Sequence, residues 1–207
     1  MKISYKVPHH SQEGNNTCGL ATARMILEYF GYKMTEDEFL KETYMHKYGS
    51  WYSDLCKPFL RRGLKTRVYT INTNIYSPFW AGKSEKELRK LLLERKKKLK
   101  GLLKTEIEKL IEYLDLGGEL EVAIPDPKML VNTLKSQPIF IPVARSFINP
   151  NAIDDLGHYI VLNGFDGKQY SVLDPRGRKY KVDRKILEYA WLANNRDSDG
   201  YLMKVLN

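Results

Sequence analysis

The feature that most constrains the fold is a change in the spacing of apolar residues along the chain. Up to about residue 135, most apolar residues recur every three or four positions, as on one face of a helix. Beyond that point, short apolar runs alternate with turn residues, as in β-strands. Helices followed by strands, without an internal repeat, predict an α+β fold formed by a single domain over residues 1–207.

Capping and turn residues mark where the predicted elements begin and end. Thr35 is followed three residues later by Glu38, the pattern of a capping box, and Phe39 and Leu40 are expected to face inward. Gly101 is expected to divide a long periodic segment into two helices. Helices are predicted at 18–30, after 35, and at 54–62, 83–116, 127–135 and 184–191, and strands at 65–70, 138–144, 158–165, 170–173, 180–182 and 201–206.

Composition places the chain among globular proteins. Hydrophobic residues make up 43% and charged residues 29% of its 207 residues. No apolar run approaches the 18 or so residues of a membrane span, and the first ten residues do not resemble a secretion signal, so we expect a cytoplasmic protein. Two cysteines and four histidines show no zinc-site spacing, and we predict no metal and no cofactor.

The positive charge is concentrated in one segment. The formal net charge is +9, and the stretch 83–109 holds 11 Lys or Arg residues against 5 Glu residues. A basic helix of this kind is most often a solvated face, and its functional interpretations are a lid or a dock for an acidic partner. Nucleic acid is not expected as a partner, because the segment lacks interleaved aromatic residues.

Cys18 is the first candidate for chemistry. It begins an apolar helix directly after a polar loop, and a helix N-terminus favours the thiolate form of a cysteine. The alternative is a small buried hydrophobic residue that packs at the helix start. Cys56 lies within a predicted helix and is interpreted as structural, with a redox partner for Cys18 as the alternative.

Gln12, His158 and Asp174 together support the interpretation of Cys18 as a nucleophile, although each of them alone has an ordinary structural explanation. Gln12 lies six residues upstream, where its amide could donate a hydrogen bond to an oxyanion. His158 begins a strand and could act as a general base, and Asp174 ends the next strand of the same hairpin, where it could orient the imidazole. The alternatives are a surface glutamine, a structural histidine and a turn aspartate. His9 and His10 are expected at the surface, or else lining the cleft.

Two segments resemble the bacteriocin-processing (double-glycine leader) peptidases and their stand-alone relatives, which are papain-like cysteine peptidases. The segments are VPHHSQEGNNTCGLATARMILEYFGY and GHYIVLNGFDGKQYSVLDPRG. The resemblance implies a papain-like fold, in which a helical N-terminal half carrying the nucleophile helix packs on a C-terminal antiparallel sheet. It also implies that the segment at about 83–116 is a lysine-rich helical insertion, and that Thr17 stands where transporter-linked members often have aspartate.

The resemblance implies a catalytic set of Cys18 as nucleophile, His158 as proton shuttle, Asp174 as orienting residue and Gln12 in the oxyanion hole. The expected activity is hydrolysis of a peptide or amide bond in a peptide or protein substrate through a thioester acyl-enzyme. The alternatives are an acyl or peptidyl transferase on the same fold, or a non-catalytic binding module that uses the basic helix.

Overall fold

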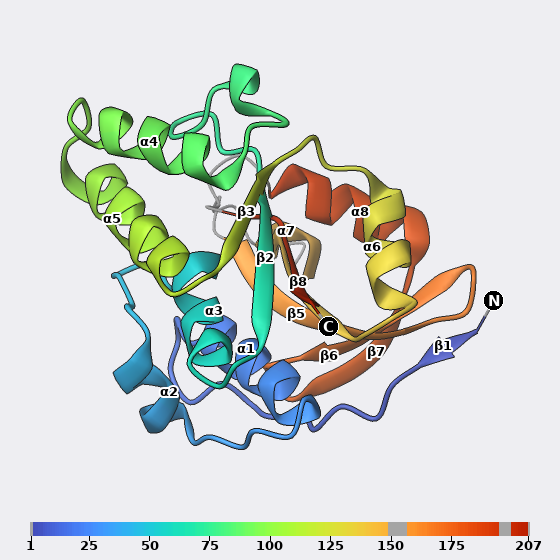
Figure 1. Cartoon of the computed structure of the whole chain (residues 1–207). Helices are drawn as coiled ribbons and strands as arrows, with labels where there is room; N and C mark the ends of the chain where they lie inside the picture. Colours follow the sequence, from blue (N-terminus) through green and yellow to red (C-terminus); the bar gives the residue numbers. More distant parts are fainter. Residues whose placement is uncertain (1, 149–156, 195–199, 207) are drawn as a thin grey trace.

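An antiparallel sheet forms the centre of the computed structural model, which describes residues 2–148, 157–194 and 200–206 (Figure 1). The sheet runs in the order β1 (Ile3–Ser4), β5 (Gly157–Phe165), β6 (Gln169–Asp174) and β7 (Arg178–Asp183). β4 (Ile139–Ala144) pairs with the same edge of β5 as β1 but nearer the start of β5, whereas β1 pairs with its last residues. The predicted hairpin of β5 and β6 is confirmed, and it pairs Val161 with Leu173 and Phe165 with Tyr170.

Helices cover both faces of this sheet. α1 (Cys18–Tyr29) packs against β5, whereas α6 (Pro127–Leu134) and α8 (Arg184–Ala193) lie on the opposite side of the strands (Figure 1). Successive side chains of a strand point to opposite faces, and β5 accordingly divides its residues between two cores. Tyr159 and Val161 join the core that contains α1, whereas Ile160 and Leu162 join the core beneath α6 and α8.

A smaller sheet has the order β3 (Glu119–Val122), β2 (Lys65–Thr70) and β8 (Leu202–Leu206). β2 runs parallel to β3 and antiparallel to β8. β3 was not predicted, because a four-residue strand with two glutamates gives almost no apolar alternation. α3 (Tyr52–Leu60) packs between β2 and α1, and it begins two residues before the predicted start.

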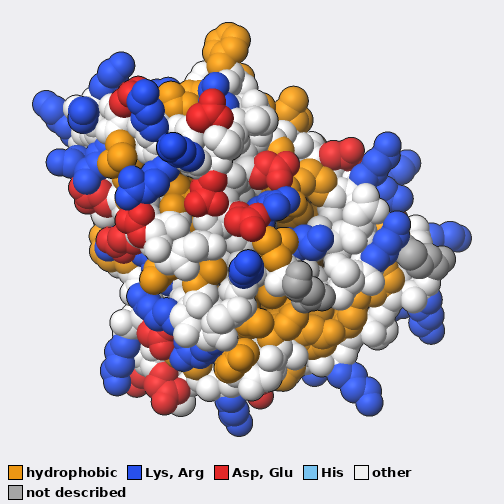
Figure 2. Space-filling view, in the orientation of Figure 1, with side chains coloured by type: hydrophobic (Ala, Val, Ile, Leu, Met, Phe, Trp, Pro, Cys, Tyr) orange, Lys and Arg blue, Asp and Glu red, His pale blue; other side chains and the backbone are white. Residues whose placement is uncertain are grey.

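The basic segment folds into two helices, α4 (Glu85–Lys96) and α5 (Gly101–Asp115), as predicted. Gly101 has a φ of 58°, which an L side chain rarely adopts, so the chain turns there. Leu88 and Leu92 of α4 and Ile107 and Leu110 of α5 are buried in the core that contains α1. Lysine and arginine side chains gather over α4, interspersed with acidic side chains (Figure 2).

The remaining helices are α2 (Glu36–Glu42), the 3-10 turn η1 (Pro78–Trp80) and α7 (Arg145–Ile148). The capping box of α2 is confirmed, with Thr35 and Glu38 bonded reciprocally. The prediction that Leu40 faces inward is wrong: Phe39 is fully buried, but Leu40 is 38% exposed, because adjacent positions lie about 100° apart around a helix. Within the described residues, no helix is long and apolar enough to cross a membrane.

Candidate active site

Cys18 is the first residue of α1 and lies partly buried beside the start of β5. Burial on its own raises the pKa of the thiol. The hydrogen bond and charge of His158, with the backbone N–H groups of Tyr159 and Gly19, outweigh that effect and lower the pKa below its ordinary value. A thiolate is the nucleophilic form of cysteine, so this environment increases the nucleophilicity of Cys18 at a given pH.

His158 and Asp174 form a buried pair on the β5–β6 hairpin. His158 lies at the start of β5 and Asp174 at the end of β6, so strand pairing brings the two side chains together. The Nε2 atom of His158 donates to Oδ1 of Asp174 over 2.9 Å. Since Nε2 is engaged by the carboxylate, Nδ1 is the ring atom left for the thiol of Cys18.

The ionisation of the His158–Asp174 pair follows from its contacts. Burial lowers the pKa of His158, but hydrogen bonds to Asp174 and Cys18 raise it above the ordinary value. Burial raises the pKa of Asp174, but His158 and the backbone N–H of Arg176 lower it more. The contacts therefore shift the pKa values of Cys18, His158 and Asp174 in the directions that favour their charged forms.

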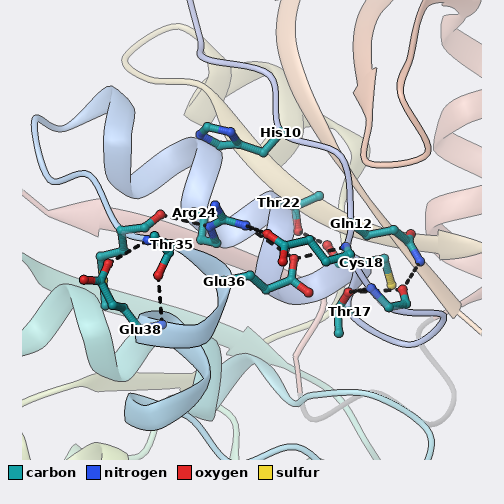
Figure 3. Close-up of polar contacts among 12 residues, drawn as sticks. His10, Gln12, Thr17, Cys18, Thr22, Arg24, Thr35, Glu36 and Glu38 are labelled. Atoms are coloured by element: carbon teal, nitrogen blue, oxygen red, sulfur yellow. Dashed lines mark hydrogen bonds and ion pairs between the residues drawn. The ribbon is translucent and has the colours of Figure 1, made fainter.

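Gln12 lies in the loop before α1, but its side chain is engaged within that loop. Its Nε2 atom donates to the carbonyl oxygens of Gly14 over 2.6 Å and Asn15 over 3.2 Å (Figure 3). The Oε1 atom is buried and accepts no hydrogen bond from the described residues. Gln12 must therefore release at least one of these carbonyls before its amide can donate to an oxyanion.

The main chain of Gln12 is tied to the turn that follows Asp174. The backbone N–H of Gln12 donates to the carbonyl of Pro175 over 2.7 Å. Two residues before this loop, Nε2 of His9 donates to the carbonyl of Asp174 over 2.8 Å. His10 instead contacts Glu28 over 2.6 Å. His9 therefore supports the backbone of Asp174, a role that its sequence context did not indicate.

A charged network, buried at Arg24 and Glu36, anchors the loop from the other side (Figure 3). Arg24 of α1 contacts Glu36 of α2 over 3.3 Å and Glu13 of the loop over 3.5 Å. The backbone N–H of Glu13 donates to the same carboxylate oxygen of Glu36 over 3.3 Å. This network was not predicted, although an arginine inside the apolar segment CGLATARMILEYF is a sequence signal for a buried ion pair.

A polar cavity of about 640 Å³ opens beside the loop. The loop contributes one wall, and two arginines from the strand side contribute the other; the lining residues are Gln12, Glu13, Gly14, Asn15, Asn16, Arg145 and Arg176. The lining includes Gln12 and Arg176, which lies two residues after Asp174. Among the described residues, no three histidine, cysteine or carboxylate groups are placed to hold a metal ion.

Residues 4–88 match the model of the Peptidase_C39 like family. No curated protein matches the chain in sequence. The matched segment contains Gln12 and Cys18, and it ends well before His158 and Asp174. The match therefore supports a cysteine-peptidase function through the nucleophile segment.

Solved structures share the fold over the whole chain. A protein described as a C39-like peptidase from Bacillus anthracis is 16% identical, with a TM-score of 0.52, covering 100% of this chain and 98% of that one. A double glycine motif protease from an AMS/PCAT transporter, solved with its leader peptide, is 18% identical, with a TM-score of 0.50 and coverage of 98% and 92%. The peptidase domain of Streptococcus ComA is 12% identical, with a TM-score of 0.50 and coverage of 96% and 96%.

These likenesses confirm the predicted fold class and the predicted resemblance. The chain has the papain-like fold of C39-like peptidases and resembles the double-glycine leader peptidases and a stand-alone relative.

Proposed function

We propose that this chain, which has the fold of C39-like peptidases, is a cysteine peptidase or amidase that uses Cys18, His158 and Asp174. The observation that carries the proposal is the contact series from thiol to imidazole to carboxylate, in which the thiol has a lowered pKa and the imidazole a raised one. Such a series contains a nucleophile, a base and a group that orients the base.

The reaction begins when the Cys18 thiolate attacks the carbonyl carbon of the scissile bond. The backbone N–H of Cys18 and the amide of Gln12, once released from its loop carbonyls, would stabilise the oxyanion. His158 gives its proton to the departing amine, which leaves a thioester on Cys18. A water molecule then attacks the thioester while His158 accepts a proton from the water. The carboxylic acid product leaves, and the thiolate of Cys18 is regenerated.

Asp174 would hold His158 in one orientation throughout this cycle. Its carboxylate accepts from Nε2, so the opposite ring nitrogen faces the thiol and can exchange the proton with it. The substrate would be a peptide or protein chain. An acidic partner at the lysine-rich segment, and the status of about 83–116 as an insertion in a single domain, remain predictions, as does a cytoplasmic location.

The proposal is tested by the rate at which iodoacetamide alkylates Cys18 as a function of pH, with Cys56→Ala removing the second thiol. We expect a midpoint well below the value of about 8.5 for an ordinary cysteine. His158→Ala should raise the midpoint toward that value, because the imidazolium no longer stabilises the thiolate. An ordinary midpoint that His158→Ala leaves unchanged would contradict the proposal.

Product analysis addresses the hydrolytic step. Peptide mixtures incubated with the protein should yield new free carboxyl termini, and Cys18→Ala should abolish them. If added amines are incorporated as amides in preference to water, the chain is a transferase and the hydrolytic part of the proposal fails.

A further inference from the structure

His9 lies outside the proposed catalytic set, yet its side chain contacts the residue that would orient the general base. Its Nε2 atom lies 2.8 Å from the main-chain carbonyl oxygen of Asp174, which is 165 positions away in the sequence. A carbonyl oxygen can only accept a hydrogen bond, so Nε2 of His9 carries the hydrogen and donates it. Because the protonated imidazole also has a hydrogen on Nε2, the contact is possible in both charge states of His9.

The carbonyl that His9 contacts opens the turn of residues 174–177. The same oxygen accepts from the backbone N–H of Gly177 over 3.0 Å, which closes the turn. Inside the turn, the backbone N–H of Arg176 donates over 2.9 Å to Oδ1 of Asp174, the carboxylate oxygen that also accepts from His158. The position of this oxygen therefore depends on the backbone of the turn, which His9 holds at its first residue.

The segment 9–12, which leads toward Cys18, is attached to this turn at both of its ends. The backbone N–H of Gln12 donates to the carbonyl of Pro175 over 2.7 Å. The side chain of His9 makes the contact at the other end of the segment. The chain that delivers the thiol is thus joined to the hairpin that carries the imidazole and the carboxylate.

The carboxylate of Asp174 also has charged and titratable neighbours besides His158. Arg176 lies beside it, and Tyr180 and Arg178 lie on β7, the strand that pairs with β6. These groups act on the carboxylate itself, whereas His9 contacts the main chain. The contribution of the His9 contact is therefore to the placement of the carboxylate.

We propose that His9 is a positioning residue for the reaction, whose Nε2–H group holds the turn of residues 174–177 where the carboxylate of Asp174 meets His158. This inference rests on the proposed cysteine-peptidase function. Loss of the contact would loosen the turn and weaken the hydrogen bond from His158 to Asp174. The imidazolium would then be less favoured, and the pKa of Cys18 would rise.

The test compares two amide side chains at position 9. In His9→Gln the amide nitrogen lies about as far along the side chain as Nε2 of histidine, and it can donate to the same carbonyl. In His9→Asn the side chain is one methylene shorter, and its amide does not reach that oxygen. Both variants remove the imidazole, so a difference between them reports the hydrogen bond and not the titration of His9. The measurement is the pH midpoint of Cys18 alkylation by iodoacetamide, with Cys56→Ala in every variant.

We expect His9→Asn to raise the midpoint by about half a pH unit, which corresponds to losing part of one hydrogen bond. His9→Gln should keep the wild-type midpoint. In the His158→Ala background both variants should have the same midpoint, because a residue that acts through His158 has no effect once the imidazole is gone. The matched control is His10→Asn, at the adjacent histidine, whose Nε2 atom contacts Glu28 of α1 over 2.6 Å and which should leave the midpoint in place.

Equal midpoints in the wild type, His9→Asn and His9→Gln would overturn the positioning role. A shift of the same size in both amide variants would also overturn it, as would a shift in His9→Asn that persists in the His158→Ala background. Should His9→Asn fail to fold, His9→Ala provides the same comparison with His9→Gln.

Failure of the proposed function has a different signature. The wild-type midpoint would then be that of an ordinary cysteine and would not respond to His158→Ala. A low midpoint that responds to His158→Ala but not to His9→Asn would contradict the role of His9 and leave the peptidase proposal standing.

Discussion

His158 has polar partners on both sides of its ring while remaining almost wholly out of solvent. Its side chain is 3% exposed, and Asp174 beside it is fully buried. A buried imidazole without partners would lose its charge, because burial penalises the protonated form. The carboxylate on one side and the thiol on the other reverse that tendency, so the charge on each member depends on the other two.

Asp174→Asn should shift the pH dependence of Cys18 alkylation upward. Without the carboxylate, the pKa of His158 falls, the imidazolium is lost at lower pH, and the pKa of Cys18 rises toward its ordinary value. The measurement is the alkylation midpoint for the variant and the wild type. Asp166→Asn, at the other end of the same hairpin, is the control and should leave the midpoint in place. An unchanged midpoint in Asp174→Asn would show that Asp174 does not sustain the charge of His158.

At the scale of elements, the loop before α1 (residues 11–17) is held by contacts that involve α1, α2 and the turn after Asp174. α1 is buried along 19–27, including Arg24, so its polar side chains must find partners inside the protein. Arg24 finds them in Glu36 of α2 and Glu13 of the loop. On the other side, Gln12 is bonded to the turn after Asp174. The loop is therefore positioned by packing and polar contacts together.

Glu36→Gln should destabilise the protein and disturb the loop. The substitution leaves the buried guanidinium of Arg24 without its buried carboxylate, a change that costs about 3 kcal/mol in comparable pairs. Urea unfolding measures the loss of free energy, and the rate of Cys18 acylation by an activated ester reports on the loop. Asp37→Asn is an exposed control one residue away and should change neither. A stability equal to wild type would show that the Arg24–Glu36 contact contributes little.

At the scale of the whole molecule, the basic segment is joined to α3 through an ion pair between the buried Lys57 and Glu112 of α5. Lys57 of α3 contacts Asp54 of the same helix and Glu112 of α5, each over 2.7 Å. Asp54 is fully buried and Lys57 nearly so, whereas Glu112 is half exposed. The apolar faces of α4 and α5 share a core with α1, so the segment is an integral layer of the fold.

Lys57→Met should destabilise the protein most at neutral and alkaline pH. Burial raises the pKa of Asp54 even though the ammonium group of Lys57 lowers it. In Lys57→Met that ammonium group is missing, so the pKa of Asp54 rises further. The folded state then binds a proton that the unfolded state has released, so stability falls as pH increases through the window above about 4. The expected loss is about 3 kcal/mol at pH 8, and it should shrink in acid.

Thermal and urea unfolding of Lys57→Met between pH 4 and 8 checks this dependence. Lys104→Met, an exposed lysine of α5 without an ion pair among the described residues, is the control and should show no such pH dependence. A loss of stability in Lys57→Met that is constant with pH would show that the ionisation of Asp54 does not account for that loss.

Local sequence signals predicted most of the elements because those signals act over a few residues. The capping box at Thr35, the break at Gly101 and the hairpin that carries His158 follow from backbone geometry that depends on near neighbours. β3 was missed because its pairing with β2 is parallel and joins residues about fifty positions apart. The orientation of Leu40 was wrong because both it and Phe39 are apolar, and only packing decides which is covered.

The sequence by itself determined the place of Cys18 at a helix start and the hairpin that joins His158 to Asp174, since periodicity and turn residues are local properties. The tertiary structure alone decided which groups surround them. It engaged the amide of Gln12 with loop carbonyls, set His9 against the backbone of Asp174, buried Arg24 beside Glu36 and brought Arg145 and Arg176 to one cavity. These contacts join segments distant in the chain, and their energies depend on burial and distance, which no local pattern encodes.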